Sequence, residues 1–363
     1  MSRSGTPRLR GNRNPLGSMT DTNLLTLITV VVFFVMYLCA ICFLQKGFLK
    51  PQTLFNMLSA NAALIILSCG LSLVMITGGI DISVGGVTAL VATSSAVYMD
   101  MHGGNVFVAL LISLGIGLLF GIVQGYLVAF LEIQPFIVTL AGMFFARGMT
   151  TIINSVPFDV KNEQFVGLKN ARITIPFLGS YNKNDVFVNA KMELGVLVAV
   201  AVVIVMFIFL KWTKTGRSFY AVGGNRQSAL MLGINVRRTR FLSHLICGLL
   251  AGLGGFIFLL HVGSGSPMHG EGYEMDAIAS SIIGGTMLTG GVGNIVGTFF
   301  GVMSLSLIQN IVSSLGYDRP WWPKITVAAM LCFFLIIQSI IIAQRKRAIT
   351  TANKQDAPKE VKT

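Results

Sequence analysis

Long apolar runs, separated by short polar segments, recur along the whole of this 363-residue chain. An α-helix of about 20 predominantly apolar residues is long enough to cross the hydrocarbon core of a bilayer. The pattern predicts ten helical spans, which are Leu24–Leu44, Phe55–Thr77, Ile82–Met99, Val106–Phe130, Pro135–Ile153, Glu193–Leu210, Arg240–Val262, Met275–Leu288, Asn294–Leu315 and Pro323–Ala343.

Two of these runs differ from a plain span. The eighth is too short to cross a bilayer straight, and its Gly284-Gly285 pair predicts a broken helix. Interrupted helices occur at membrane depth only where they face protein or a wet cavity. The first run is longer than the core of a signal peptide and no small-x-small cleavage site follows it, so we expect a retained span.

Composition agrees with a membrane environment. Only 11% of the residues are charged and 53% are hydrophobic, whereas a soluble domain carries about 25% charged residues. We therefore expect an all-α integral membrane protein with about ten transmembrane helices, some of them short or broken. The net charge of +13 does not indicate nucleic acid, because the basic residues lie at the ends of apolar runs.

The distribution of lysine and arginine predicts the orientation. An even number of spans places both termini on one side of the membrane. If that side is the cytoplasm, 17 basic residues lie inside and nine outside, with Arg147 inside a span. Cytoplasmic loops carry an excess of lysine and arginine, so we expect an N-in, C-in topology.

These boundaries divide the chain into a basic cytoplasmic tail (residues 1–23), a transmembrane domain (24–343) and a polar C-terminal tail (344–363) that we expect to be disordered. The longest outer loop covers residues 154–192. It is either a small extracytoplasmic cap or docking surface, or a plain connection. The main inner loop covers residues 211–239.

Signatures of enzymes are absent from the sequence. The dipeptide Gly-Lys never occurs, so there is no phosphate-binding GxxxxGK[ST] loop, and neither HExxH nor GxSxG is present. All five cysteines lie inside apolar runs, which is typical of small buried hydrophobic residues rather than of metal ligands. We expect a non-catalytic protein with no cofactor and no metal site.

The inner loop is the most informative segment. From Thr213 to Arg238 it reads TKTGRSFYAVGGNRQSALMLGINVRR, with four arginines and no acidic residue. Gly223-Gly224-Asn225 predicts a turn, and the residues from Arg226 to Leu232 predict a short helix closed by Gly233. Such an element suits the docking of a cytoplasmic partner; alternatively, its charge only fixes the orientation of the chain.

Polar residues at membrane depth are candidates for a transport pathway, because an ionisable group there costs several kcal/mol. Arg147 lies in the fifth span and Asn61 in the second. Phe136, Phe144 and Phe145 lie near Arg147 in sequence and could offer aromatic faces to a sugar. Arg147 either faces the pathway or locks its helix to a neighbour.

Other polar residues lie at the starts of spans. Asp81 and Ser83 open the third span, where an N-cap explains them at least as well as a pathway does. Glu274 and Asp276 open the eighth, where the helix dipole stabilises acidic residues. The segments GGIDISVGG (Gly78–Gly86) and GGVGNIVG (Gly290–Gly297) echo each other, but both are expected on the cytoplasmic side and so do not form an inverted repeat.

The inner loop resembles the GRxxYAxGGNxxAAxxxGI segment of ribose-type ABC sugar permeases. Three further stretches agree in order and spacing: GGIDISVGG at Gly78, QPFIVTLAGMFFARG at Gln134–Gly148 and GYEMDAIASSIIGGTMLTGGVGNIVGT at Gly272–Thr298. Ile82 stands where the family usually has leucine. The phrase LAGMFFARG and the Trp321-Trp322 pair look closest to one of the two permeases of galactofuranose importers.

This resemblance implies the partners and the role of the inner loop. Permeases of this kind act as dimers, a homodimer or a heterodimer with a second permease. They are driven by cytoplasmic ABC ATPase subunits and receive sugar from a periplasmic binding protein in the bacterial inner membrane. The inner loop then couples to the ATPase through Arg217, Tyr220, Gly223, Gly224, Asn225 and Gly233, and the sugar pathway involves Asn61, Phe136, Phe144 and Arg147.

Three alternatives remain at this stage. A related permease could carry another small solute, such as branched-chain amino acids. A secondary transporter would need buried carboxylates along its pathway, and the middles of these spans have almost none. An intramembrane enzyme would need a catalytic constellation, which the sequence lacks.

Overall fold

A computed structural model describes residues 21–44, 47–181, 187–316, 319, 321–322, 324–336 and 339–340. Its helices are α1 (Asp21–Leu44), α2 (Pro51–Ile76), α3 (Val84–Met101), α4 (Val106–Ala129), α5 (Pro135–Ile153), α6 (Glu163–Asn170), α7 (Leu194–Trp212), α8 (Lys214–Gly224), α9 (Arg226–Met231), α10 (Val236–Val262), α11 (Tyr273–Ile283) and α12 (Ile295–Ser314). Its strands are β1 (Phe158–Asp159), β2 (Arg172–Tyr181), β3 (Phe187–Glu193) and β4 (Ser264–Gly265).

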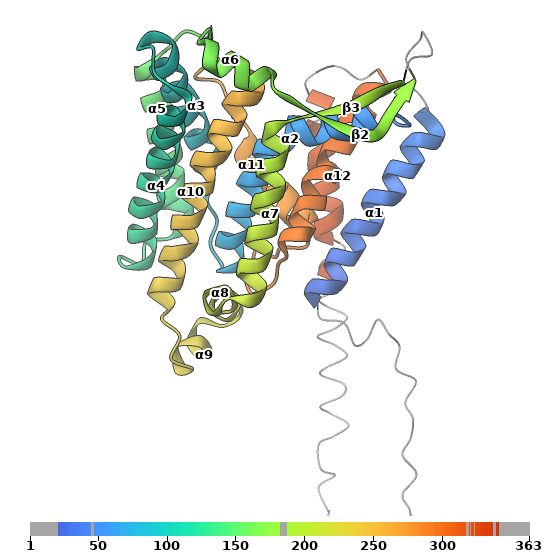
Figure 1. Cartoon of the computed structure of the whole chain (residues 1–363). Coiled ribbons are helices and arrows are strands. Elements are labelled where there is room, and N and C mark those ends of the chain that lie inside the picture. Colours follow the sequence, from blue (N-terminus) through green and yellow to red (C-terminus); the bar gives the residue numbers. More distant parts are fainter. Residues whose placement is uncertain are drawn as a thin grey trace, which may run out of the picture.

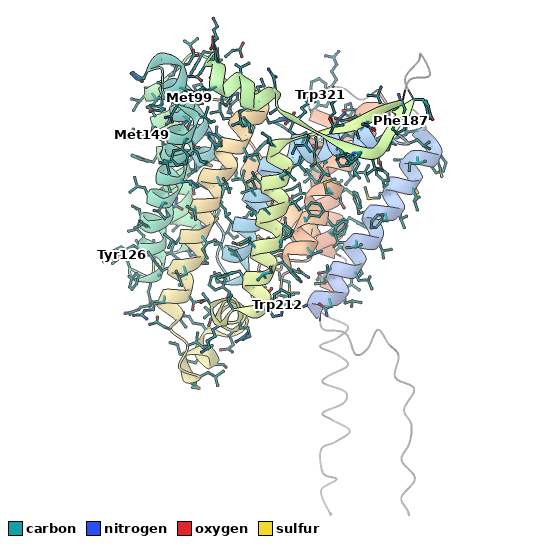
Figure 2. All side chains as sticks on the ribbon, viewed as in Figure 1. Met99, Tyr126, Met149, Phe187, Trp212 and Trp321 are labelled. Atoms are coloured by element: carbon teal, nitrogen blue, oxygen red, sulfur yellow. The ribbon has the colours of Figure 1, made fainter. Side chains whose placement is uncertain are left out.

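The long helices form a bundle with distinct ends (Figure 1). The antiparallel hairpin β2–β3 and α6 cover one end, which we call the hairpin end. The short helices α8 and α9 cover the opposite end, which we call the α8–α9 end, and α1 also begins there. Exposed tryptophans mark both ends, Trp212 at the α8–α9 end and Trp321 at the hairpin end (Figure 2). Tryptophan at both ends is typical of the two membrane–water interfaces.

Seven described helices are long and apolar enough to cross a membrane: α1 (from Asn23), α2, α4, α5, α7, α10 and α12. The multi-span prediction is therefore confirmed, while the count of ten and the N-in, C-in orientation stay predictions. Of the other predicted spans, α3 and α11 are not among the seven, and the last is described as an apolar helix over Lys324–Ile336. The prediction of an all-α protein omitted the hairpin β2–β3, which lies in the 154–192 loop. Most of residues 1–23 and 344–363 lie outside the described residues.

Helix α2 is the centre of the bundle and is almost wholly buried. Its small hydroxyl side chains face α11 and α12. The Ser72 hydroxyl lies 3.0 Å from that of Ser281 and 2.7 Å from that of Thr298, and the Ser68 hydroxyl lies 3.3 Å from that of Ser280. Hydrogen bonds of this kind hold transmembrane helices together where water cannot compete for them.

Helices α4 and α10 approach each other closely through glycine. A Cβ atom on Gly117 would overlap the carbonyl oxygen of Gly248, and one on Gly248 would overlap that of Gly117. Gly121 and Gly252 extend the same contact along the two helices. This small-xxx-small spacing lets backbones meet directly, which gives apolar helices in lipid their packing energy.

Two helices begin part-way along the bundle instead of at one of its ends (Figure 1). α3 starts at Val84, and a Cβ atom on its Gly86 would lie 2.9 Å from the carbonyl oxygen of Met143, near the middle of α5. α11 starts at Tyr273, with the Glu274 carboxylate against Gly85 of α3. The prediction of a broken eighth helix is confirmed, since α11 is only 11 residues long and ends before Gly284-Gly285.

Candidate functional site

The segment between α7 and α10 is built from two capped helices. The Thr213 hydroxyl accepts a hydrogen bond from the Gly216 amide at 2.9 Å and caps α8. The Asn225 side chain accepts one from the Ser228 amide at 2.9 Å and caps α9. Side chains of this type satisfy the free amides of a first helical turn. The loop is therefore an ordered element rather than a flexible connection.

Sequence and structure agree on the second of these helices. The predicted short helix closed by Gly233 is confirmed to within one residue, because α9 ends at Met231 and Gly233 has a φ of +77°. The turn predicted at Gly223-Gly224-Asn225 is wrong. Gly223 and Gly224 are the last two residues of α8. The chain leaves the helix one residue later, at Asn225, which has an extended backbone.

Gly223 is wedged against the ends of other helices. A Cβ atom there would overlap the carbonyl oxygen of Ile76, the last residue of α2, and would lie 2.6 Å from the Gly291 amide nitrogen. That same amide donates to the Ile76 carbonyl at 2.9 Å. A Cβ atom on Gly290 would lie 3.0 Å from the Cα atom of Gly78 and 2.9 Å from the Gly223 carbonyl oxygen. The two glycine-rich segments that echo each other in sequence therefore meet here, and α8 packs on the second of them and on the end of α2.

Tyr220 makes a second link between α8 and the α11–α12 loop. Its hydroxyl donates to the Gly293 carbonyl oxygen at 2.9 Å. Burial raises the pKa of Tyr220 to about 12, so the phenol is neutral and remains a donor at physiological pH. This hydrogen bond joins α8 to the loop that leads into α12.

All four arginines of the loop are exposed at its surface. Arg217 donates to the Trp212 carbonyl oxygen at 3.3 Å and is exposed. Arg226 pairs with Glu132 of the α4–α5 connection at 2.9 Å, and Arg237 lies 3.9 Å from the same carboxylate. Exposed pairs contribute only about 0.2–1 kcal/mol to stability, so these charges remain available to a partner.

Helix α9 also presents apolar side chains to the outside. Leu230 is 48%, Met231 79% and Leu232 78% exposed. Adjacent large hydrophobic residues with a basic rim, here Arg226 and Arg237, are typical of a protein contact site. The surface of α9 can therefore receive a protein whose own surface offers an apolar cleft and acidic groups.

A polar pocket of about 290 Å³ lies between α2, α11 and α12. Its polar lining residues include Asn61, Tyr273, Asp276, Ser306, Gln309 and Asn310. The Asn61 amide donates to the Met57 carbonyl and to the Ser306 hydroxyl, both at 2.8 Å. Of the residues predicted from sequence for a pathway, Asn61 is the one that lines this pocket.

Phe136 and Phe144 lie on α5, away from the polar pocket. They are 45% and 64% exposed on the outside of the bundle, and α5 packs on α3 and α4 rather than on the pocket helices (Figure 1). Their surroundings are apolar, as in the neighbouring groove lined by Leu119, Val123 and Phe145. A pathway role for Phe136 and Phe144 stays a prediction.

Arg147 ties α5 to the segment that leads into α11. Its guanidinium donates to the carbonyl oxygens of Pro267 at 3.2 Å, His269 at 2.5 Å and Gly270 at 2.8 Å. A planar guanidinium with several donors is suited to such a cluster of carbonyls. These contacts match one of the two alternatives given from the sequence, in which Arg147 holds its helix to a neighbouring segment. A role of Arg147 in the pathway is untested.

Sequence reasoning assigned Asp81 and Asp276 to helix ends and missed what surrounds them. The Asp81 carboxylate is buried and accepts from the Ser83 amide at 2.9 Å and from its hydroxyl at 2.6 Å. Asp276 instead faces the polar pocket with Gln309 and Asn310. The polar pair Gln309-Asn310 inside an apolar run was the signal available in the sequence. Among the described residues, no group of acidic, histidine and cysteine side chains could hold a metal ion.

The sequence pattern of a transporter family, described as the permease component of branched-chain amino acid transport systems, matches residues 53–335. The chain belongs to this permease family. Members are transport subunits, and their shared segment contains the polar pocket, α8 and α9. No solved structure matches the chain.

Several relatives are similar over nearly their whole length. The inner membrane ABC transporter permease protein YjfF of Escherichia coli (strain K12) is 35% identical over 94% of this chain and 97% of its own. The fructose import permease protein FruG of Bifidobacterium longum (strain NCC 2705) is 33% identical over 90% and 94%. The ribose import permease protein RbsC of Escherichia coli (strain K12) is 32% identical over 82% and 88%. The resemblance to ribose-type sugar permeases is therefore confirmed.

Proposed function

We propose that this protein is a membrane-spanning permease subunit of an ATP-driven ABC importer that brings a monosaccharide across the bacterial inner membrane. The observation that carries the proposal is its similarity, over nearly the full chain, to permeases named for fructose and ribose import. The family description names branched-chain amino acids, but the relatives named for a solute are named for sugars.

The sugar belongs to the ribose- or galactofuranose-like class. Ribose is supported by the similarity to RbsC. Galactofuranose is supported by the phrase LAGMFFARG and the Trp321-Trp322 pair alone. Either sugar offers several hydroxyl groups, so the pathway needs hydrogen-bonding side chains within the membrane.

Helices α8 and α9 are the proposed coupling element for a cytoplasmic ATPase. The exposed apolar residues of α9 and the arginines Arg217 and Arg226 supply its contact surface. Gly223 and Tyr220 supply the transmission, because both are in direct contact with the ends of membrane helices. Gly224 and Asn225 join α8 to α9, and Gly233 ends the element with a backbone conformation suited to glycine.

The remaining partners follow from the same scheme. With the α8–α9 end in the cytoplasm, the hairpin end faces the periplasm and is the docking side for a sugar-binding protein. A second permease, identical or different, completes the pathway. This arrangement corresponds to the N-in, C-in orientation favoured by the basic residues.

Uptake measurements in the host cell test this function. Deleting the gene should abolish ATP-dependent uptake of one labelled monosaccharide and leave leucine uptake unchanged. Uptake should resist a protonophore that collapses the ion gradient, because ATP hydrolysis drives transport directly. Lost leucine uptake would support the amino-acid alternative, and sensitivity to the protonophore under constant ATP would support a secondary transporter.

A further inference from the structure

We propose that the polar pocket between α2, α11 and α12 is a sugar-binding station within the membrane, in which the Asp276 carboxylate accepts hydrogen bonds from two sugar hydroxyls. This inference rests on the proposed function and adds to it a specific site and its key residue. Asn61 and Gln309 complete the set of hydrogen-bonding groups that face the same space.

The position of the pocket fits a station on a transport path. Asn61 lies near the middle of α2, and Asp276 lies in the first turn of α11, which begins part-way along the bundle. Ser306 and Asn310 follow along α12 toward the hairpin end. The pocket therefore extends from the interior of the bundle toward the side from which a binding protein would deliver sugar.

The chemistry of this face excludes lipid as its neighbour. An acidic side chain at the centre of a bilayer costs about 2.5–3.5 kcal/mol even on insertion scales, and Asp276 has amide side chains beside it. The groove between α4 and α5 shows the contrast, because its lining is almost entirely apolar. A polar face in the membrane must border water, a solute or a partner subunit.

The hydrogen bonds already made in the pocket leave specific groups available. The amide nitrogens of Asn61 and Asn310 donate within the protein, the latter to the Ser306 carbonyl at 2.8 Å. Among the described residues, the side chains of Asp276 and Gln309 make no hydrogen bond and no ion pair, although the backbone carbonyl of Asp276 accepts from Ser280. Lys324 and Glu274 are the charged neighbours that act on Asp276 electrostatically.

These available groups match the needs of a sugar. Each hydroxyl can donate and accept, a carboxylate accepts from two neighbouring hydroxyls, and a primary amide does both. The volume of about 290 Å³ lies just below the range of about 300–1,000 Å³ for small-molecule sites. A monosaccharide rather than a larger solute is the appropriate ligand class.

The test compares two acidic residues of the same helical turn. In the complete transporter reconstituted in liposomes, Asp276→Asn should lower kcat/KM for the transported sugar by about 10-fold or more, the usual cost of losing a hydrogen bond to a charged group. Glu274→Gln is the matched control, because it removes the same charge from the same turn but its carboxylate lies against Gly85 instead. Because Glu274 also acts on Asp276 electrostatically, we expect Glu274→Gln to lower kcat/KM for the sugar, but by less than Asp276→Asn does.

Discrimination between the sugar and its deoxy analogues distinguishes a sugar contact from a structural role of Asp276, because a purely structural role would leave that discrimination unchanged. Wild type should discriminate against the analogues that lack the bound hydroxyls, and Asp276→Asn should lose that discrimination. Unchanged discrimination in Asp276→Asn, with normal wild-type uptake, overturns the pocket and leaves the proposed function intact. Absence of sugar uptake by the wild-type complex overturns the proposed function and this inference with it.

A second measurement tests the pocket even if Asp276→Asn fails to assemble into the transporter. Gln309→Cys, in a protein without its five native cysteines, should react with a membrane-impermeant maleimide added from the hairpin side. Sugar with its binding protein should slow that reaction at least about threefold, because the bound sugar excludes the reagent. Unreactive Cys at this position, or reaction that sugar does not slow, contradicts the proposed station.

Discussion

Gly223 offers a sharp test of how α8 is coupled to the membrane helices. A Cβ atom on Gly223 would lie 1.8 Å from the carbonyl oxygen of Ile76, whereas ordinary contact begins at 3.4 Å. The substitution Gly223→Ala must therefore move α8 away from α2 by about 1.6 Å, the difference between these two distances. Backbone atoms form the obstacle, so no side-chain rotation can relieve it.

The size of the effect follows from the cost of overpacking, which is typically about 1–3 kcal/mol. If the substitution destabilises by this amount the conformation in which α8 contacts α2, the stimulation of ATP hydrolysis by sugar should fall by about 5–150-fold. Gly224→Ala is the matched control. It lies next in the same helix and makes the same gain in helix propensity, but a Cβ atom there meets nothing within 4 Å.

The assay is sugar-stimulated ATP hydrolysis by the complex of permease, ATPase and binding protein in liposomes. We expect Gly223→Ala to lose at least about fivefold of the stimulation, with basal hydrolysis by the ATPase retained, and Gly224→Ala to behave as wild type. Equal stimulation in both variants, with both complexes assembled, would refute transmission through this contact. Equal loss in both would show that the effect comes from glycine in general and not from the wedge.

Three further predictions concern other parts of the molecule. Arg147→Gln should lose the three hydrogen bonds to carbonyl oxygens and lower the free energy of unfolding by about 3 kcal/mol. The measurement is the Tm in detergent, which should fall. An unchanged Tm with impaired sugar uptake would instead favour a role of Arg147 in the pathway. Burial raises the pKa of Tyr220 from 10 to about 12. The contribution of Tyr220 to stability should therefore be constant below about pH 10 and be lost as the pH rises toward 12. In melting curves Tyr220→Phe should not show this alkaline loss, and a dependence of Tm on pH identical to that of wild type would contradict the prediction. Single cysteines at Asn170 and Asn225, which lie at opposite ends of the bundle, should be labelled from opposite sides of the membrane, and labelling of both from outside would exclude the proposed orientation.

Much of the bundle was predictable because lipid imposes a simple length rule on helices. The runs from Val106 and from Pro135 begin where α4 and α5 begin. The arrangement of the helices was not predictable in this way, because lipid solvates every apolar helix face about equally well and so does not decide which faces pack together. Direct packing through Gly117 and Gly248 depends on spacing between helices that are distant in sequence. The hairpin β2–β3 was missed because the alternation of polar and apolar residues in its strands is short, over Arg172–Ile175 and Asn189–Glu193, and lies within a polar loop.

The candidate site was predictable where local chemistry decides structure. Gly233 predicted the end of α9, because glycine readily adopts the left-handed conformation that closes a helix. Asn225 was interpreted only as a turn residue, whereas its side chain caps α9. Gly223 was interpreted as a turn residue, because a sequence does not show that a backbone carbonyl from α2 will lie against it. Asp276 was likewise explained by its place in a helix, and only the assembly of three helices brings it beside Gln309.

Reconstituted transport is the most direct measurement of the central claim. Liposomes containing this permease with its partner permease and ATPase, supplied with binding protein outside and ATP on the α8–α9 side, should accumulate labelled monosaccharide against its gradient. Vanadate, or omission of ATP, should stop accumulation, while a collapsed ion gradient should not. Accumulation that persists without ATP, or uptake of a branched-chain amino acid in place of any sugar, would contradict the assignment of this protein as a sugar permease of an ABC importer.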